Sequence, residues 1–123
     1  MKKCKIYDNV YDSSVTLYIN GTVKDIEVDF KKCTGDEINL ETFYGCQGFF
    51  TVFIKPNILL LYVRKFNGKI EEYGTLMHEL RHYIDWVMYT RPIKRRKEDN
   101  TPEAPAYFTE YIVNKVLKEI RKK

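Results

Sequence analysis

Two runs of alternating apolar and polar residues stand near the start of the chain, at residues 15–19 and 22–30, separated by Asn20-Gly21. Such alternation indicates strands with one buried face. Asn-Gly between two such runs is a strong hairpin signal, because both turn positions need a positive φ. The pattern therefore predicts a β-hairpin across the two runs. Residues 37–44 fit either a short helix or a strand.

A second pair of strands is predicted in the middle of the chain. Residues 49–55 and 58–65 are rich in aromatic and β-branched side chains, which favour extended structure. Pro56-Asn57 between them marks the connection. These two runs extend the predicted sheet.

After these strands the apolar residues recur with a helical period, which predicts a helix over about residues 71–89. The apolar stripe consists of Leu76, Leu80, Ile84 and Val87. Pro92 ends this helix, because the residue before a proline disfavours the α conformation. After a polar loop, a last helix is predicted over about residues 103–121. The order of elements predicts an α+β fold, with a mostly antiparallel sheet packed on the two helices.

The composition narrows the class of protein. A chain of 123 residues that is 44% hydrophobic and 31% charged fits a single domain over residues 1–123. Its apolar runs are too short for a membrane span, and its first residues do not form a secretory signal, so we expect a cytoplasmic protein. Three cysteines without a C-x-x-C pair argue against a disulfide framework.

The pentad His78-Glu79-Leu80-Arg81-His82 contains both histidines of the chain. Two imidazoles four residues apart on a helix share one face, about 6 Å apart along the axis. Both can therefore reach a single tetrahedral zinc ion. Glu79 lies beside the open coordination position, where a carboxylate can take a proton from water. This H-E-x-x-H spacing is typical of zinc hydrolases.

A zinc site of this kind needs a third protein ligand. Glu103 begins the last helix, and the small residues after it would let the two helices approach closely. The alternative is an ordinary first-turn glutamate that the helix dipole favours. Glu110, two turns into the helix, and Glu98, in the charged loop, are weaker candidates.

H-E-x-x-H on one helix, followed by a glutamate at the start of a second helix, resembles the gluzincin metallopeptidases. The resemblance covers roughly residues 49–115 and includes an E-x-x-A pattern that begins at Glu103. It implies a compact zincin-like core. It also implies zinc ligands at His78, His82 and Glu103, with Glu79 as general base.

Further roles remain open at the sequence level. Asp85 could orient a ligand imidazole, or it could pair with Arg81. A peptidase site also needs a group that stabilises the oxyanion. Tyr107 and Tyr111, one and two turns after Glu103, are candidates, although aromatic residues at this spacing are also common in cores.

In zincins, an exposed edge strand near the motif helix pairs with extended substrate. Residues 58–64 or 48–54 could supply that strand in this chain. The resemblance thus implies recognition of a peptide through its main chain.

Two other interpretations compete with a gluzincin. Gly45-Cys46 upstream of the pentad resembles the segment of peptide deformylases that carries a cysteine ligand, although the flanking residues depart from that family. The chain could also be a non-catalytic binding or regulatory domain. We expect a monomeric zinc peptidase that acts on a peptide or protein. Its basic runs at residues 94–97 and 121–123 fit solvated surface, so neither nucleic acid nor membrane is an expected partner.

Overall fold

The computed structural model describes residues 1–53, 58–90 and 103–122, and the side chains of these residues except 103–105. Within these ranges the chain has a mixed α+β fold, with a four-stranded sheet, three α-helices and one 3-10 turn. In chain order the elements are β1 (Lys2–Asp8), β2 (Ser13–Ile19), α1 (Val23–Thr34), η1 (Glu41–Phe43), β3 (Gly48–Phe53), β4 (Ile58–Val63), α2 (Ile70–Thr90) and α3 (Glu103–Arg121). Among the described residues, no helix has both the length and the apolar character needed to cross a bilayer.

The sheet is mixed, with the strand order β1-β2-β4-β3. β1 pairs antiparallel with β2, and β3 pairs antiparallel with β4. The pairing of β2 with β4 between them is parallel, so the predicted antiparallel pairing holds for the two outer pairs of strands. This order places β4 inside the sheet and leaves β1 and β3 at its two edges.

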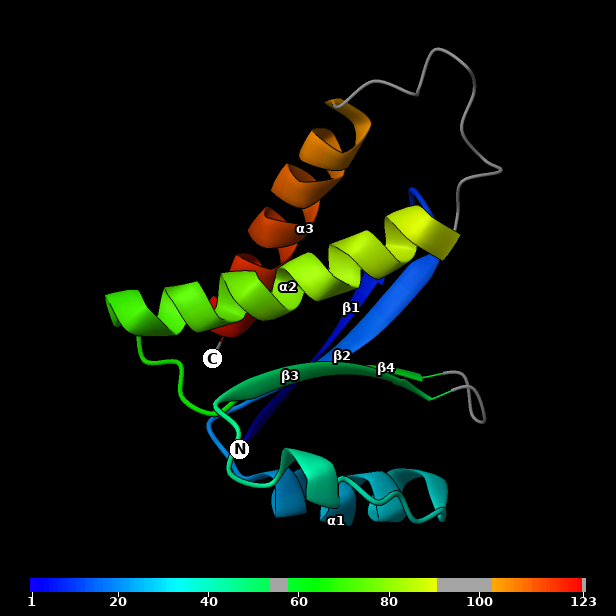
Figure 1. Cartoon of the computed structure of the whole chain (residues 1–123), viewed down its shortest axis with the longest axis vertical. Coiled ribbons are helices and arrows are strands. Elements are labelled where there is room, and N and C mark those ends of the chain that lie inside the picture. The colour runs from blue at the N-terminus through cyan, green and yellow to red at the C-terminus, as the bar shows by residue number, and fades with distance from the viewer. Residues whose placement is uncertain (54–57, 91–102, 123) are drawn as a thin grey trace.

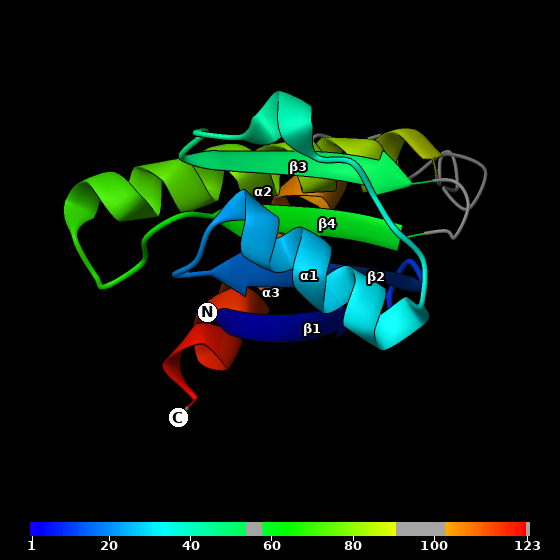
Figure 2. The ribbon, with the colours of Figure 1, turned by 90° about the horizontal axis from the view of Figure 1, so that it is seen from below.

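Helices cover both faces of the sheet (Figure 1, Figure 2). α1 lies on one face, and α2 and α3 lie on the other. On that second face α2 packs over β3 and β4, whereas α3 packs against β1 and one side of α2. The core between the sheet and these two helices includes the fully buried side chains of Leu17, Leu61, Leu80, Tyr83, Val87 and Ile112.

The prediction of a strand at residues 22–30 is wrong, because the structure has helix α1 there. Thr22 accepts a hydrogen bond from the backbone N–H of Asp25, and the Asp25 side chain accepts one from Thr22 in return. This capping box starts a helix. Val28, which the alternation requires inside, is 67% exposed. The buried residues instead follow helical spacing: Val23, Ile26 and Phe30.

The antiparallel partner of β2 is therefore β1, which the pattern did not predict. The sequence pattern of β1 is a weak indication of a strand, because only two buried apolar residues, Cys4 and Ile6, alternate with polar ones. The predicted strands at residues 49–55 and 58–65 are confirmed as β3 and β4, and both later helices are confirmed as α2 and α3. The Pro56-Asn57 connection and the basic run at residues 94–97 lie outside the described residues.

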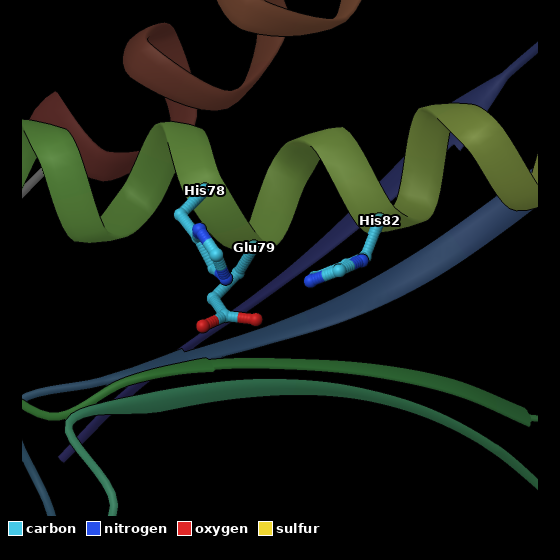
Figure 3. Close-up of side chains that lie close together, drawn as sticks. All are labelled: His78, Glu79 and His82. Atoms are coloured by element: carbon cyan, nitrogen blue, oxygen red, sulfur yellow. The ribbon is translucent and has the colours of Figure 1, made fainter.

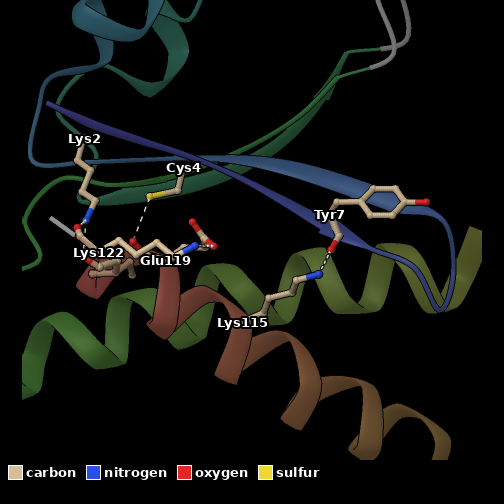
Figure 4. Close-up of polar contacts among 7 residues, drawn as sticks. Lys2, Cys4, Tyr7, Lys115, Glu119 and Lys122 are labelled. Carbon is tan, nitrogen blue, oxygen red and sulfur yellow. Dashed lines mark hydrogen bonds and ion pairs between the residues drawn. The ribbon is translucent and has the colours of Figure 1, made fainter.

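Polar contacts tie the C-terminal half of α3 to β1 (Figure 4). The Lys2 ammonium group donates to the backbone carbonyls of Ile120 and Lys122, at the end of the helix. Farther along, the Lys115 ammonium group donates to the carbonyl of Tyr7. A cation at the carbonyl end of a helix is favourable, because the helix dipole is negative there. These contacts fix α3 over the β1 side of the sheet.

Replacing Lys2 with Met should lower the free energy of unfolding by about 1 kcal/mol, because the last carbonyl groups of α3 lose their cationic donor. Lys5→Met is the matched control, since Lys5 is exposed on the opposite face of the same strand. Urea unfolding followed by circular dichroism measures both variants. Equal stability of the two would contradict a stabilising role for the Lys2 contacts.

Candidate metal centre

Two histidines and a glutamate converge on one flank of α2 (Figure 3). His78, Glu79 and His82 each offer a ligand atom, and these atoms all lie within 4.8 Å of one another. The centroids of the two imidazole rings are 4.9 Å apart, and the ring planes make an angle of 83°. One turn of helix thus brings together the three side chains that the pentad singles out.

The two histidines lie beside the buried face of α2, not within it. The apolar side chains of that face are Leu76, Leu80, Tyr83, Ile84 and Val87. His78 and His82 are exposed. Core packing therefore does not account for them, and both imidazoles are accessible to an ion from solvent.

Glu79 stands at the border between the core and this accessible flank. Its side chain is largely buried, with 8% of the residue exposed, and among the described residues no hydrogen bond reaches its carboxylate. Burial raises the pKa of this carboxyl group, and the electrostatic interaction with the neighbouring His78 and His82 acts in the opposite direction. Glu79 lines the groove beside the two imidazoles, so a cation held by them would lie close enough to stabilise its carboxylate.

The donor set fits zinc. Imidazole nitrogen and carboxylate oxygen are both ligands of this ion, and a catalytic zinc site keeps one position open for water. Two histidines on a single turn fix the relative positions of two ligands through the helix itself. His78 and His82 are therefore candidate zinc ligands that need one further protein ligand, with the Glu79 carboxylate beside them.

β3 passes very close to Glu79, at Gly48. A Cβ atom at residue 48 would lie 3.1 Å from Glu79 Cγ, 3.1 Å from Thr75 Cγ2 and 2.9 Å from the Tyr62 carbonyl oxygen. These distances are shorter than ordinary contacts, so glycine is the residue that fits without displacement. The absence of a side chain at residue 48 lets the strand backbone lie directly beside the candidate base.

An open groove of about 640 Å³ runs between this flank of α2 and β3. His78, Glu79 and His82 line it on the helix side, and Gly48 lines it on the strand side. Much of the remaining lining is aromatic, from Phe43, Phe49, Phe50, Trp86 and Tyr89. The groove is therefore largely apolar, with one polar section at the candidate metal ligands.

The two candidate third ligands lie in different places. Cys46 is half-buried just before β3 and lines the groove. Glu103 is the first residue of α3, and its side chain is among those not described. The described part of α3 packs against α2 and against β1, the edge strand opposite β3. Of the weaker candidates, Glu110 is exposed and Glu98 lies outside the described residues.

Asp85 pairs with Arg81, the second of the two roles considered from the sequence. Its carboxylate accepts two hydrogen bonds from Arg81 Nε, at 2.9 and 3.0 Å, in an exposed ion pair one turn apart on α2. Asp85 also lines the groove. Its described hydrogen bonds go to Arg81, and none goes to an imidazole.

The two tyrosine candidates lie on α3. Tyr107 is 66% exposed. The Tyr111 hydroxyl donates to Asn9 Oδ1 at 3.2 Å and accepts a hydrogen bond from Lys115 Nζ at 3.1 Å. Tyr111 thus contacts the turn between β1 and β2, and neither tyrosine is among the described residues that line the groove.

Sequence reasoning missed Gly48 and the aromatic lining of the groove. Trp86 and Tyr89 follow His82 by four and seven residues, so helical spacing alone could have placed them on its flank. Gly48 carries no such signal, because its role depends on a contact with a helix far along the chain.

Comparison of the chain with protein-family models, with curated proteins and with solved structures finds no match. A function is therefore inferred from the chemistry of the groove itself.

Gly48→Ala should lower the free energy of unfolding by about 1–3 kcal/mol, because the added methyl group presses on Glu79 and Thr75. The matched control is Gly74→Ala in α2, where a Cβ atom meets nothing within 4 Å and the helix gains about 0.5–1 kcal/mol. Thermal or urea unfolding of both variants measures the difference. Gly48→Ala with wild-type stability would contradict the close approach of β3 to α2.

Proposed function

We propose that this protein is a zinc-dependent peptidase of the gluzincin type, with His78 and His82 as zinc ligands and Glu79 as general base. The observation that carries the proposal is that these side chains meet in a groove beside the edge strand β3. An ion, a base and an extended peptide would come together there. A zincin-like core is part of the proposal, supported by the packing of α2 against β3 and of α3 against α2.

The residues of the groove have distinct roles in peptide hydrolysis. Zinc, when bound, would activate water and polarise the scissile carbonyl group. Glu79 accepts a proton on its carboxylate as water attacks, and then donates that proton to the leaving amine. His78 and His82 hold the ion next to this carboxylate.

β3 can bind an extended peptide through its backbone. The Arg64 N–H donates to the Gln47 carbonyl at 2.8 Å, which sets the alternation of the ladder between β3 and β4. In an antiparallel pair, every second residue points its N–H and C=O away from the partner strand. These residues are Gly48, Phe50 and Val52, so their backbone groups face the open edge. A substrate chain could add to the sheet there by β-augmentation.

The two edges of the sheet differ in their protection against such pairing. β1 carries Lys2, Lys3 and Lys5, and lysines on an edge strand discourage the addition of another strand. β3 has the sequence GFFTVF, without charge or proline. An unprotected apolar edge is a liability unless it is used. Its position beside Glu79 supports a use in binding substrate.

We propose Glu103 as the third zinc ligand, on the strength of its position at the start of α3. Cys46 is the second candidate, because it lines the groove, and it would make the site similar to that of a deformylase. A non-catalytic binding domain is the remaining alternative, and it would need no zinc.

Protein purified without added metal should contain about one zinc ion per chain. A chelator should abolish the cleavage of peptides, and zinc should restore it. Glu79→Gln should keep the zinc but lower the cleavage rate by about a hundredfold or more, because the general base is lost. Glu71→Gln, which changes an exposed carboxylate in the first turn of α2, is the matched control. Full activity of Glu79→Gln would refute this mechanism, and a chain that takes up no zinc would favour the binding domain.

The third ligand can be identified by comparing zinc affinity in Glu103→Ala and Cys46→Ser. We expect Glu103→Ala to weaken zinc binding by at least about a hundredfold, since the loss of a ligand exceeds the loss of an outer hydrogen-bond partner. Cys46→Ser should have little effect. Competition with a chromogenic chelator measures both affinities. The reverse order would assign Cys46 as the ligand.

A further inference from the structure

The flank of α2 that carries the histidines continues as a row of aromatic residues. Trp86 and Tyr89 follow His82 with the spacing of one helical face. Both line the groove, and Phe50 of β3 lines it as well. Tyr89 is 83% exposed, whereas Phe50 and Trp86 are partly buried, packing against the core while also facing the groove. Phe50, Trp86 and Tyr89 together are termed the aromatic subsite.

α2 and β3 run in the same direction along the groove (Figure 1, Figure 2). Glu79 of the helix lies beside Gly48 of the strand. One helical turn later, Tyr83 lies beside Phe50, with ring centroids 5.9 Å apart. Four helical residues rise about 6 Å, close to the roughly 6.6 Å that two strand residues span. Helix and strand therefore stay in step, and the aromatic subsite follows the metal-binding section along the groove.

An extended peptide paired with β3 would pass both sections of the groove. The rise along the helix from Glu79 to Trp86 is about 10 Å, which an extended chain covers in about three residues. A side chain two or three residues from the cleaved bond would therefore reach the aromatic subsite.

The chemistry of the subsite favours one class of side chain. Aromatic rings pair with other rings in stacked or edge-to-face geometry, which adds to the gain from apolar burial. The charged side chain described in this part of the groove, Asp85, is already paired with Arg81 at 2.9 Å. An aromatic side chain thus gains more here than a charged one.

We propose that the aromatic subsite selects peptides with an aromatic side chain two or three residues from the cleaved bond. This proposal rests on the peptidase function proposed above and specifies its substrate class. The backbone pairing with β3 fixes the position of the chain, and Trp86 supplies the preference for the side chain.

Digestion of a mixture of random peptides, read by mass spectrometry, tests this selection. Wild-type protein should cut with Phe, Tyr or Trp enriched at one position, two or three residues from the bond. Trp86→Ala should remove that enrichment and lower kcat/KM for a Phe-containing peptide by about tenfold, mainly through KM. The ratio of kcat/KM for the Phe-containing peptide to that for the matching Ala-containing peptide should therefore fall. Trp86→Phe should retain the preference.

A matched control removes an aromatic ring elsewhere. Tyr7 is half-exposed on β1, at the opposite edge of the sheet. Tyr7→Ala should leave the cleavage profile unchanged. Zinc content measured on every variant separates a loss of selection from a loss of the metal site.

The fluorescence of Trp86 provides a second readout that does not need turnover, because it is the sole tryptophan of the chain. In zinc-loaded Glu79→Gln protein, a short blocked peptide with one Phe should shift the emission of Trp86. The same peptide with Ala in place of Phe should not do so at the same concentration.

The outcomes separate this proposal from the peptidase function. Cleavage without aromatic enrichment, or enrichment that survives Trp86→Ala, would overturn the aromatic subsite and leave the peptidase in place. A Phe-dependent shift in emission without any cleavage would overturn the peptidase and retain the subsite. The absence of both cleavage and emission change would overturn both proposals.

Discussion

The close approach of β3 to α2 sets the geometry of the whole groove. At residue 48 a methyl group would lie 3.1 Å from both Glu79 and Thr75, so the distance between strand and helix depends on a glycine. The matched rise of the two elements then keeps them in step as far as Phe50 and Tyr83. The candidate base is thereby held against the strand that would bind substrate. A larger residue at position 48 would move Glu79 away from strand β3.

The sheet is anchored along one edge and open along the other. On the β1 side, Lys2 and Lys115 donate hydrogen bonds to backbone carbonyls and hold α3 in place, and lysines protect the strand edge. On the β3 side the strand is apolar and has backbone groups that face outward. One continuous core joins both halves, so the open edge is supported by packing from the anchored one. A small fold can in this way keep an exposed strand without losing its structure.

The sequence predicts an element well where its period is unambiguous. In α2 the apolar stripe from Leu76 to Val87 follows a helical period over about three turns and excludes a strand, so helix and pentad were both placed correctly. In α1 the apolar residues fit a period of two as well as a helical one. The capping box of Thr22 and Asp25 favours the helix. This local hydrogen-bond pattern is not visible in the alternation of apolar and polar residues. A turn signal at Asn20-Gly21 then strengthened the wrong alternative, although this turn leads into a helix.

Some residues of the candidate site are placed by local sequence, and others only by the tertiary fold. The pentad places His78, Glu79 and His82 through the helix alone, whereas Gly48 and Phe50 enter the groove because the sheet carries β3 beside α2. The third ligand is the part of the site least determined by local sequence, since it has to come from outside α2. A zinc ion bound by Glu103 would join the first turn of α3 to the pentad of α2. Because the Lys2 contacts already hold the far end of α3, such a ligand would fix this helix at both ends.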